Sequence, residues 1–238
     1  MKPVRLGSVV IPPVTAIILA TLLACFIVTG IVVNFVPTLA NVVSYLPVTT
    51  EGVLSGQVWR LLSYALVHNL ADPFHVLFNA MAIFFFGREL EERWGSGRFT
   101  VFALLTILVG GIFVVVTGLV MAGHGNAIGA SALAEGLIVA WGLTYRDREI
   151  RLFFAIPVRG IHMVWLALFM WLMQAVSVSG TSAAAHLGGI VTALVLVLGV
   201  WRPNAVKLGW SNLLEKLGFK KKQKLYVVPK PSDQKWVN

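Results

Sequence analysis

The run VTAIILATLLACFIVTGIVVNFV, residues 14–36, decides the fold of this chain. It lies within a longer stretch, residues 6–50, that contains no formally charged side chain. At about 1.5 Å per residue, a helix of this length crosses the roughly 30 Å hydrocarbon core of a bilayer. The apolar stretch after Lys2 and Arg5 is too long for a secretory signal, and no small-residue cleavage site follows it. We therefore expect a retained membrane helix.

Five more apolar runs bring the predicted number of membrane spans to six. They are residues 74–87, 99–121, 131–145, 162–178 and 183–201. The second and fourth spans have apolar cores of only about 15 residues, or about 22 Å, so they leave polar space inside a bundle. The composition agrees, because 58% of the 238 residues are hydrophobic and 12% are charged. Soluble domains carry roughly 25% charged residues, and a disordered chain has little apolar content.

These spans predict an all-α polytopic membrane protein in three parts. Residues 1–13 form a cytoplasmic amino terminus, residues 14–201 form the six-span membrane domain, and residues 202–238 form a basic cytoplasmic tail. The long non-spanning segment, residues 37–73, contains Trp59 and Tyr64, which suit a membrane interface. We expect this first loop to lie in or on the outer leaflet.

The positions of the basic residues set the expected orientation. The chain has 19 Lys and Arg against 10 Asp and Glu, for a net charge of +9. Arg60 is the one basic residue expected outside; the other 18 fall in the two termini and in the connections after the second and fourth spans. The positive-inside rule therefore places both termini in the cytoplasm. We expect a bacterial inner membrane, with the lysines of 220–224 near anionic lipid and no nucleic-acid partner, since no reading motif accompanies them.

Cysteine and histidine give no sign of a metal centre. Cys25 is the single cysteine, so neither an intrachain disulfide nor a thiolate zinc cluster can form. The histidines lack the short paired spacings of a metal-binding helix; they are His68, His75, His124, His162 and His186. We expect no metal and no cofactor. No sequence pattern specifies an oligomeric state.

Polar side chains within the predicted spans are the candidates for function, because such groups are costly at membrane depth. His75 and Asn79 share one face of the second span, four residues apart. Such a pair, taken alone, is usually a structural link between helices. Ser131 opens the fourth span after a glycine-rich approach, where free backbone N–H groups point toward an anion. His186 lies in the sixth span.

Small residues indicate that the fourth and sixth spans pack closely. They form two ridges, Ala132, Gly136 and Ala140 on one helix and Ala185, Gly189 and Ala193 on the other. Close packing would bring Ser131 toward His186 near the outer end. The chemistry that fits is acyl transfer, with a serine nucleophile, an imidazole base and oxyanion donors from His75, Asn79 and the Ser131 N–H.

These residues resemble the rhomboid family of intramembrane serine proteases. The resemblance covers roughly residues 59–199. Its motifs are Trp59-Arg60, His75-x-x-x-Asn79, Gly87-Arg88-Glu89-Leu90-Glu91 with Arg93 and Gly95, Gly129-Ala130-Ser131, and Ala185-His186-Leu187-Gly188-Gly189. It implies a six-helix bundle with a membrane-associated first loop, and cleavage of single-span membrane-protein substrates at or just below the membrane surface.

The resemblance also implies roles for single residues. Ser131 would be the nucleophile and His186 the general base of a dyad without an acid. His75, Asn79 and the Ser131 backbone would form the oxyanion site. Glu91 and Arg93 would be structural, holding the end of the second helix and the first loop.

Two positions depart from the family pattern. Ala132 stands where the family usually has glycine, and Glu135 stands where it usually has an aromatic residue. We hypothesise that Glu135, one turn from Ser131, orients or charge-stabilises His186. The alternatives are a protonated Glu135 bonded to a neighbouring span and a water-bound group beneath the site.

Two other functions compete with an active protease. An inactive rhomboid-like protein would bind transmembrane helices in the same groove, although such a relative would be expected to lose Ser131 or His186. A small transporter or channel is disfavoured, because the spans contain no inverted repeat and no paired carboxylates along a pathway.

Overall fold

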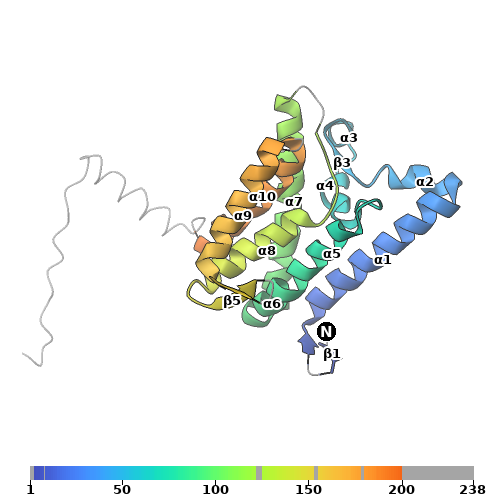
Figure 1. Cartoon of the computed structure of the whole chain (residues 1–238). Helices are drawn as coiled ribbons and strands as arrows, with labels where there is room; N and C mark the ends of the chain where they lie inside the picture. The colour runs from blue at the N-terminus through green and yellow to red at the C-terminus, as the bar shows by residue number, and fades with distance from the viewer. Residues whose placement is uncertain (1–2, 8, 122–124, 153–154, 178–179, 200–238) are drawn as a thin grey trace, which may run out of the picture. The chain divides into compact units, whose positions relative to one another are not determined.

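Each predicted apolar run coincides with a helix in the computed structural model (Figure 1). The helices are α1 (Pro13–Phe35), α5 (Pro73–Ala82) continued by the π-helical η2 (Ile83–Gly87), α7 (Ser96–Val120), α8 (Ser131–Thr144), α9 (Gly160–Ser177) and α10 (Gly180–Leu198). The structure describes residues 3–7, 9–121, 125–152, 155–177 and 180–199. His124 and the tail 202–238 lie outside these residues. Met1–Leu198 form one compact unit.

The helices differ in length, as their sequences predict. Among the described residues, α1 and α7 are long and apolar enough to cross a membrane by themselves, whereas α8, α9 and α10 are apolar but shorter. With 14 residues, α8 is about 21 Å long, against about 37 Å for the 25 residues of α7. The structure is mostly helical, in agreement with an all-α membrane protein.

Helix α8 lies in the middle of the bundle. Eleven of its 14 residues are buried, because α5, α7, α9 and α10 pack around it (Figure 1). By contrast, α1 buries only Thr15, Leu22 and Thr29. A side chain carried by α8 is therefore enclosed by protein on several sides.

The predicted small-residue ridges meet, which confirms that part of the sequence analysis. A Cβ atom added to Gly189 of α10 would clash with the carbonyl oxygen of Ala132 on α8. One added to Gly136 of α8 would lie 3.2 Å from the carbonyl oxygen of Gly189. Glycine at these positions lets the two backbones touch, so side chains beside the ridges lie at the same level of the bundle.

The first loop is built from short elements and is tied to the approach to α8. It contains α2 (Pro37–Val43), β3 (Val48–Thr49), α3 (Thr50–Leu54), α4 (Arg60–Ser63) and the 3₁₀ turn η1 (Tyr64–Leu66). Strand β3 pairs antiparallel with β4 (Asn126–Ala127). The N–H of Gly129 donates to the carbonyl oxygen of Tyr64 at 2.9 Å. These bonds fix the segment that leads into Ser131.

The Trp59-Arg60 pair stabilises the first loop from within. The Trp59 indole donates to the carbonyl oxygen of Tyr45 at 3.1 Å. Arg60 is buried and donates to the carbonyl oxygens of Ser44 and Pro47, at 3.0 and 2.7 Å. Its charge is thus satisfied by backbone of the same loop.

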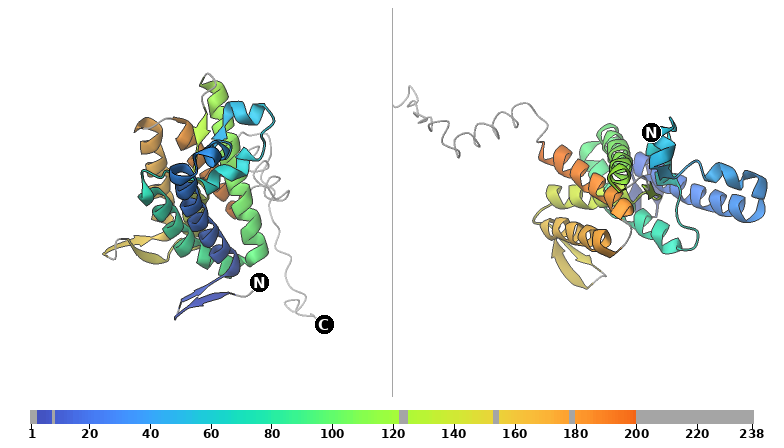
Figure 2. Two further views of the ribbon diagram at one scale, coloured as in Figure 1. Left: turned by 90° about the vertical axis from the view of Figure 1, so that its right-hand side faces the viewer. Right: turned by 90° about the horizontal axis from the view of Figure 1, so that it is seen from above.

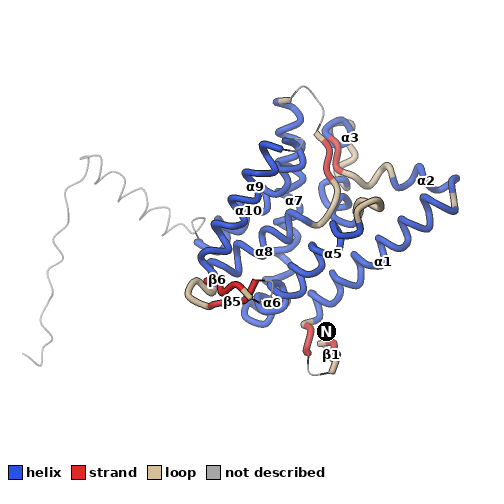
Figure 3. Tube along the Cα trace, viewed as in Figure 1, coloured by secondary structure: helices blue, strands red, loops and turns tan. Residues whose placement is uncertain are grey.

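Two antiparallel hairpins, which the sequence analysis did not predict, lie at one end of the bundle. They are β1 (Val4–Leu6) with β2 (Val9–Ile11), and β5 (Glu149–Leu152) with β6 (Ile156–Arg159) (Figure 3). The short helix α6 (Arg88–Trp94) lies at the same end (Figure 1). The segments expected on the cytoplasmic side therefore share one end of the molecule.

Candidate active site

Ser131 is the first residue of α8, and the preceding loop delivers it there. The first backbone bond of the helix runs from the Ala134 N–H to the Ala130 carbonyl at 3.0 Å, so the N–H groups of Ser131, Ala132 and Leu133 have no partner within the helix. Ser131 is buried, with 7% of its surface exposed. The start of α8 is therefore a cluster of backbone donors around a serine hydroxyl.

Gly129 packs against the imidazole of His75. Its φ of +103° favours glycine, and an added Cβ atom would lie 2.8 Å from His75 Nε2. The same Cβ would lie 3.6 Å from Asn79 Nδ2. The missing side chain at Gly129 thus lets His75 and Asn79 approach the loop that ends in Ser131.

His75 and Asn79 are held in place by helix α5. The Asp72 carboxylate caps this helix by accepting from the Phe74 N–H at 3.1 Å, and Pro73 occupies its first position. Asn79 is buried, and its Nδ2 lies 3.2 Å from His68 Nε2. The amide is therefore positioned by a second histidine behind it.

His68 is a site residue that the sequence analysis missed. The residue is 2% exposed, and its Nε2 accepts from the Ala130 N–H at 3.3 Å. The pKa of His68 is lowered from 6.5 to about 4. Burial is the main cause, and the nearby His75 is the second. The ring is thus neutral at neutral pH and can accept hydrogen bonds at Nε2. The only sequence signal was its position in the first loop, seven residues before His75.

His186 of α10 contacts Glu135 of α8. His186 Nδ1 lies 3.0 Å from Glu135 Oε1, and the side chains are 13% and 11% exposed. Nδ1 is not aligned for a hydrogen bond, and Glu135 Oε2 has no hydrogen-bond partner within the described residues. This contact places the imidazole beside the helix that begins with Ser131.

Glu91 and Arg93, expected to hold the second helix and the first loop, lie at the opposite end of the bundle from the start of α8. Glu91 accepts from the N–H groups of Val14 and Thr15 at 3.0 and 2.7 Å. Arg93 lies over the Tyr145 ring, 5.3 Å from its centroid. These contacts join α6 to the start of α1 and to the residue that follows α8.

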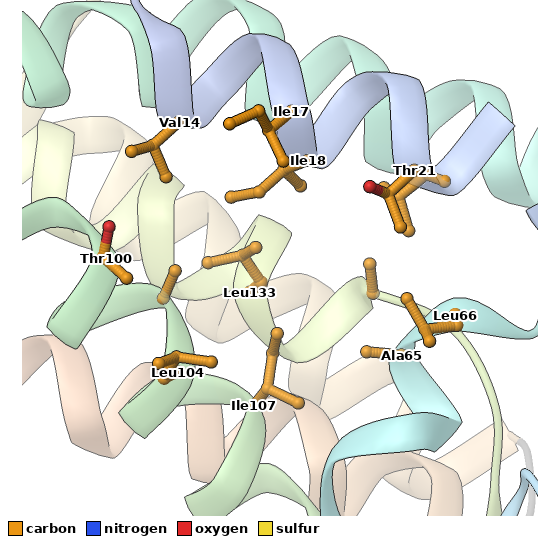
Figure 4. Close-up of a pocket in the computed structure, with 13 residues that line it drawn as sticks. Val14, Ile17, Ile18, Thr21, Ala65, Leu66, Thr100, Leu104, Ile107 and Leu133 are labelled. Carbon is orange, nitrogen blue, oxygen red and sulfur yellow. The ribbon is translucent and has the colours of Figure 1, made fainter. Parts of the chain in front are cut away.

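A separate apolar cavity of about 250 Å³ lies between α1, η1, α7 and α8 (Figure 4). Ile18 and Thr21 of α1 face Ile107 of α7 and Leu133 of α8 across it. No titratable side chain lines this cavity. It is therefore distinct from the polar cluster. Within the described part of the chain, no group of three His, Cys, Asp or Glu residues is placed to hold a metal ion.

Comparison with known proteins identifies the family. Residues 55–203 match the Rhomboid domain, which is more than half of the chain. The chain belongs to the rhomboid family. The match includes Ser131, Glu135 and His186.

A Bacillus subtilis (strain 168) protein named "Putative rhomboid protease YdcA" is similar to part of the chain. The two are 38% identical over 79 residues, which is 33% of this chain and 39% of that protein. The match thus spans well under half of the relative. Family membership and the apolar helices support a membrane protein.

Proposed function

We propose that the chain is an intramembrane serine protease that uses Ser131 as nucleophile and His186 as general base. One observation carries this proposal: polar side chains from α5, from the first loop and from α10 lie around the amino end of α8. His75 and Asn79 approach through Gly129, and His186 is held against α8 through Glu135. Rhomboid family membership supports the same chemistry.

The first step is attack on the scissile carbonyl. Ser131 Oγ forms a bond to the carbonyl carbon while its proton passes to His186 Nε2, and the π electrons of the carbonyl move onto oxygen. The Ser131 N–H, the Asn79 amide and His75 donate hydrogen bonds to this oxyanion. Each such donor contributes about 100- to 1000-fold in rate.

The second step releases the products. The tetrahedral intermediate collapses, the C–N bond breaks, and His186 gives its proton to the leaving amine. Water then attacks the acyl-enzyme as His186 takes its proton, and the serine hydroxyl is restored when the carboxylic acid leaves. No cofactor takes part in this scheme.

The substrates of the proposed reaction are single-span membrane proteins. Helix α8 is about 16 Å shorter than α7. With the inner ends of the two helices level, the amino end of α8 is recessed from the outer end of the bundle. A bond at this depth belongs to a transmembrane segment or its juxtamembrane flank. Water reaches the site from the outer side.

We further propose six membrane spans in a bacterial inner membrane with both termini in the cytoplasm. The β1–β2 hairpin, α6 and the β5–β6 hairpin share one end of the bundle (Figures 1 and 2). The connections at that end carry Arg88, Arg93 and Arg148 among their basic residues. Their charge favours the cytoplasmic side.

Cleavage of a membrane-protein reporter tests the proposal. We expect the purified protein in liposomes to cleave single-span reporters and Ser131→Ala to abolish cleavage without lowering the unfolding temperature. Reporter binding without cleavage by the wild type would favour the inactive helix-binding alternative. Normal cleavage by Ser131→Ala would contradict a serine mechanism.

A further inference from the structure

Glu135 occupies an unusual place for a carboxylate. It is 8% exposed and lies within the fully packed part of α8, between buried Ala134 and Gly136. It is also the single formally charged residue in the sequence between Thr100 and Tyr145. A carboxyl group buried at this depth is costly unless a partner compensates it.

Among the described residues, the partner of Glu135 is the imidazole of His186. Oε1 lies 3.0 Å from Nδ1, and no lysine or arginine pairs with Glu135 in the described part of the chain. Within the described part of the chain, His75 of α5 is a further titratable group close to His186. The carboxylate is therefore directed at the nitrogen that the proposed reaction does not use.

The spacing along α8 fits a shared imidazole. Ser131 and Glu135 are four residues apart, so they lie on one helix face about 6 Å apart along the axis. A ring beside that face can present Nε2 to the serine and Nδ1 to the glutamate. An ionised Glu135 then holds the proton on Nδ1, keeps the Nε2 lone pair toward Ser131, and stabilises the imidazolium that forms during attack.

We propose that Glu135 is a positioning carboxylate for His186, so that this chain uses a Ser131, His186 and Glu135 triad instead of a dyad. The inference rests on the proposed function. It assigns the unusual residue at this position a role in the reaction itself: Glu135 acts through His186 and does not touch the substrate. The 3.0 Å separation of the two atoms is within hydrogen-bond reach, and catalytic hydrogen bonds are often poorly aligned before substrate binds.

A fluorophosphonate probe measures this role directly. The Ser131 Oγ–P bond forms, the P–F bond breaks and fluoride leaves, while the serine proton passes to His186. The final amplitude of labelling counts competent molecules, and the rate constant reports how well His186 activates the serine. A residue needed only for folding changes the amplitude and leaves the rate constant unchanged.

We expect Glu135→Gln to lower the labelling rate constant by about 100-fold or more at unchanged amplitude, because removing a general base's supporting charge acts on proton transfer. Glu135→Asp, which keeps the charge on a shorter side chain, should recover part of the rate. Glu91→Gln is the matched control, a second buried carboxylate away from the site, and should keep the wild-type rate constant.

The outcomes separate this inference from the proposed function. A wild type that is not labelled at Ser131 contradicts the proposed function itself. A labelled wild type with the same rate constant in Glu135→Gln overturns the triad alone. If Glu135→Gln fails to fold, Glu135→Ala decides: a wild-type rate constant in the folded Ala variant, which has no carboxylate, also overturns the triad.

Discussion

The two ends of the bundle each bury a glutamate, and the surroundings of the two carboxylates differ. Glu91 accepts four hydrogen bonds, from the Val14 and Thr15 N–H groups and from the Thr15 and Ser96 hydroxyls. Glu135 has one imidazole contact and an unpartnered Oε2 in the described structure. Both are nearly inaccessible, with 2% and 8% of their surface exposed.

This difference matches the proposed division between a structural Glu91 and a positioning Glu135. The charge of Glu91 is balanced by fixed donors at the amino end of α1, where the helix dipole also favours an anion. Glu135 instead contacts His186, the group that changes protonation in the proposed reaction. For these two glutamates, the number of hydrogen-bond partners is therefore more informative about their roles than burial is.

The largest effect should come from removing the base next to Glu135. We expect His186→Ala to lower cleavage by at least about 10,000-fold, because neither the proton acceptor nor its carboxylate partner then acts on Ser131. Reporter cleavage in liposomes measures the loss. The unfolding temperature in detergent should stay near that of the wild type; a variant that still cleaves at more than a tenth of the wild-type rate would place the base elsewhere.

A smaller effect, on stability instead of chemistry, should follow from changes at Glu91. Glu91→Ala removes the acceptor of two backbone N–H groups and two hydroxyls; the Thr15 N–H and hydroxyl are buried, and each buried group left unpaired costs about 1–3 kcal/mol. We expect a loss of about 3 kcal/mol or more in the free energy of unfolding. Denaturation in mixed micelles measures it.

The rate constant of fluorophosphonate labelling distinguishes changes at Glu91 from changes at Glu135. For the molecules of Glu91→Ala that remain folded, this constant should equal that of the wild type. A slower constant would show that the inner end of the bundle acts on the active site, and the division between the two carboxylates would fail.

The smallest effect should come from an exposed carboxylate. Glu149 pairs with Arg159 across the β5–β6 hairpin at 3.5 Å, and both side chains are about 60% exposed. Exposed ion pairs contribute at most about 1 kcal/mol, so Glu149→Gln should leave stability and cleavage nearly unchanged. Thermal unfolding at low and high salt checks this. A loss as large as that of Glu91→Ala would mean that burial is not what distinguishes these glutamates.

The sequence predicted the helices and the contact between α8 and α10 because both depend on local patterns. Apolar runs set the helices, and the i, i+4 repeats of Ala and Gly set the ridges. The position of Glu135 one turn from Ser131 also follows from spacing alone. These features need no knowledge of distant segments.

The partners of Glu91 and the role of His68 were not predictable in this way. Glu91 binds residues 76 and 77 positions away in the sequence, and His68 contacts the Ala130 N–H from 62 positions away. The β3–β4 pairing also depends on where the first loop folds back. Such contacts arise from tertiary packing, for which a single sequence carries no local signal.

The most direct measurement of the central claim is to locate the covalent adduct of the fluorophosphonate probe. Mass spectrometry of the digested wild-type protein should find the adduct on Ser131, and Ser131→Ala and His186→Ala should carry none on the same time scale. An unlabelled wild type, or an adduct at another residue that persists in Ser131→Ala, would contradict a serine protease centred on the amino end of α8.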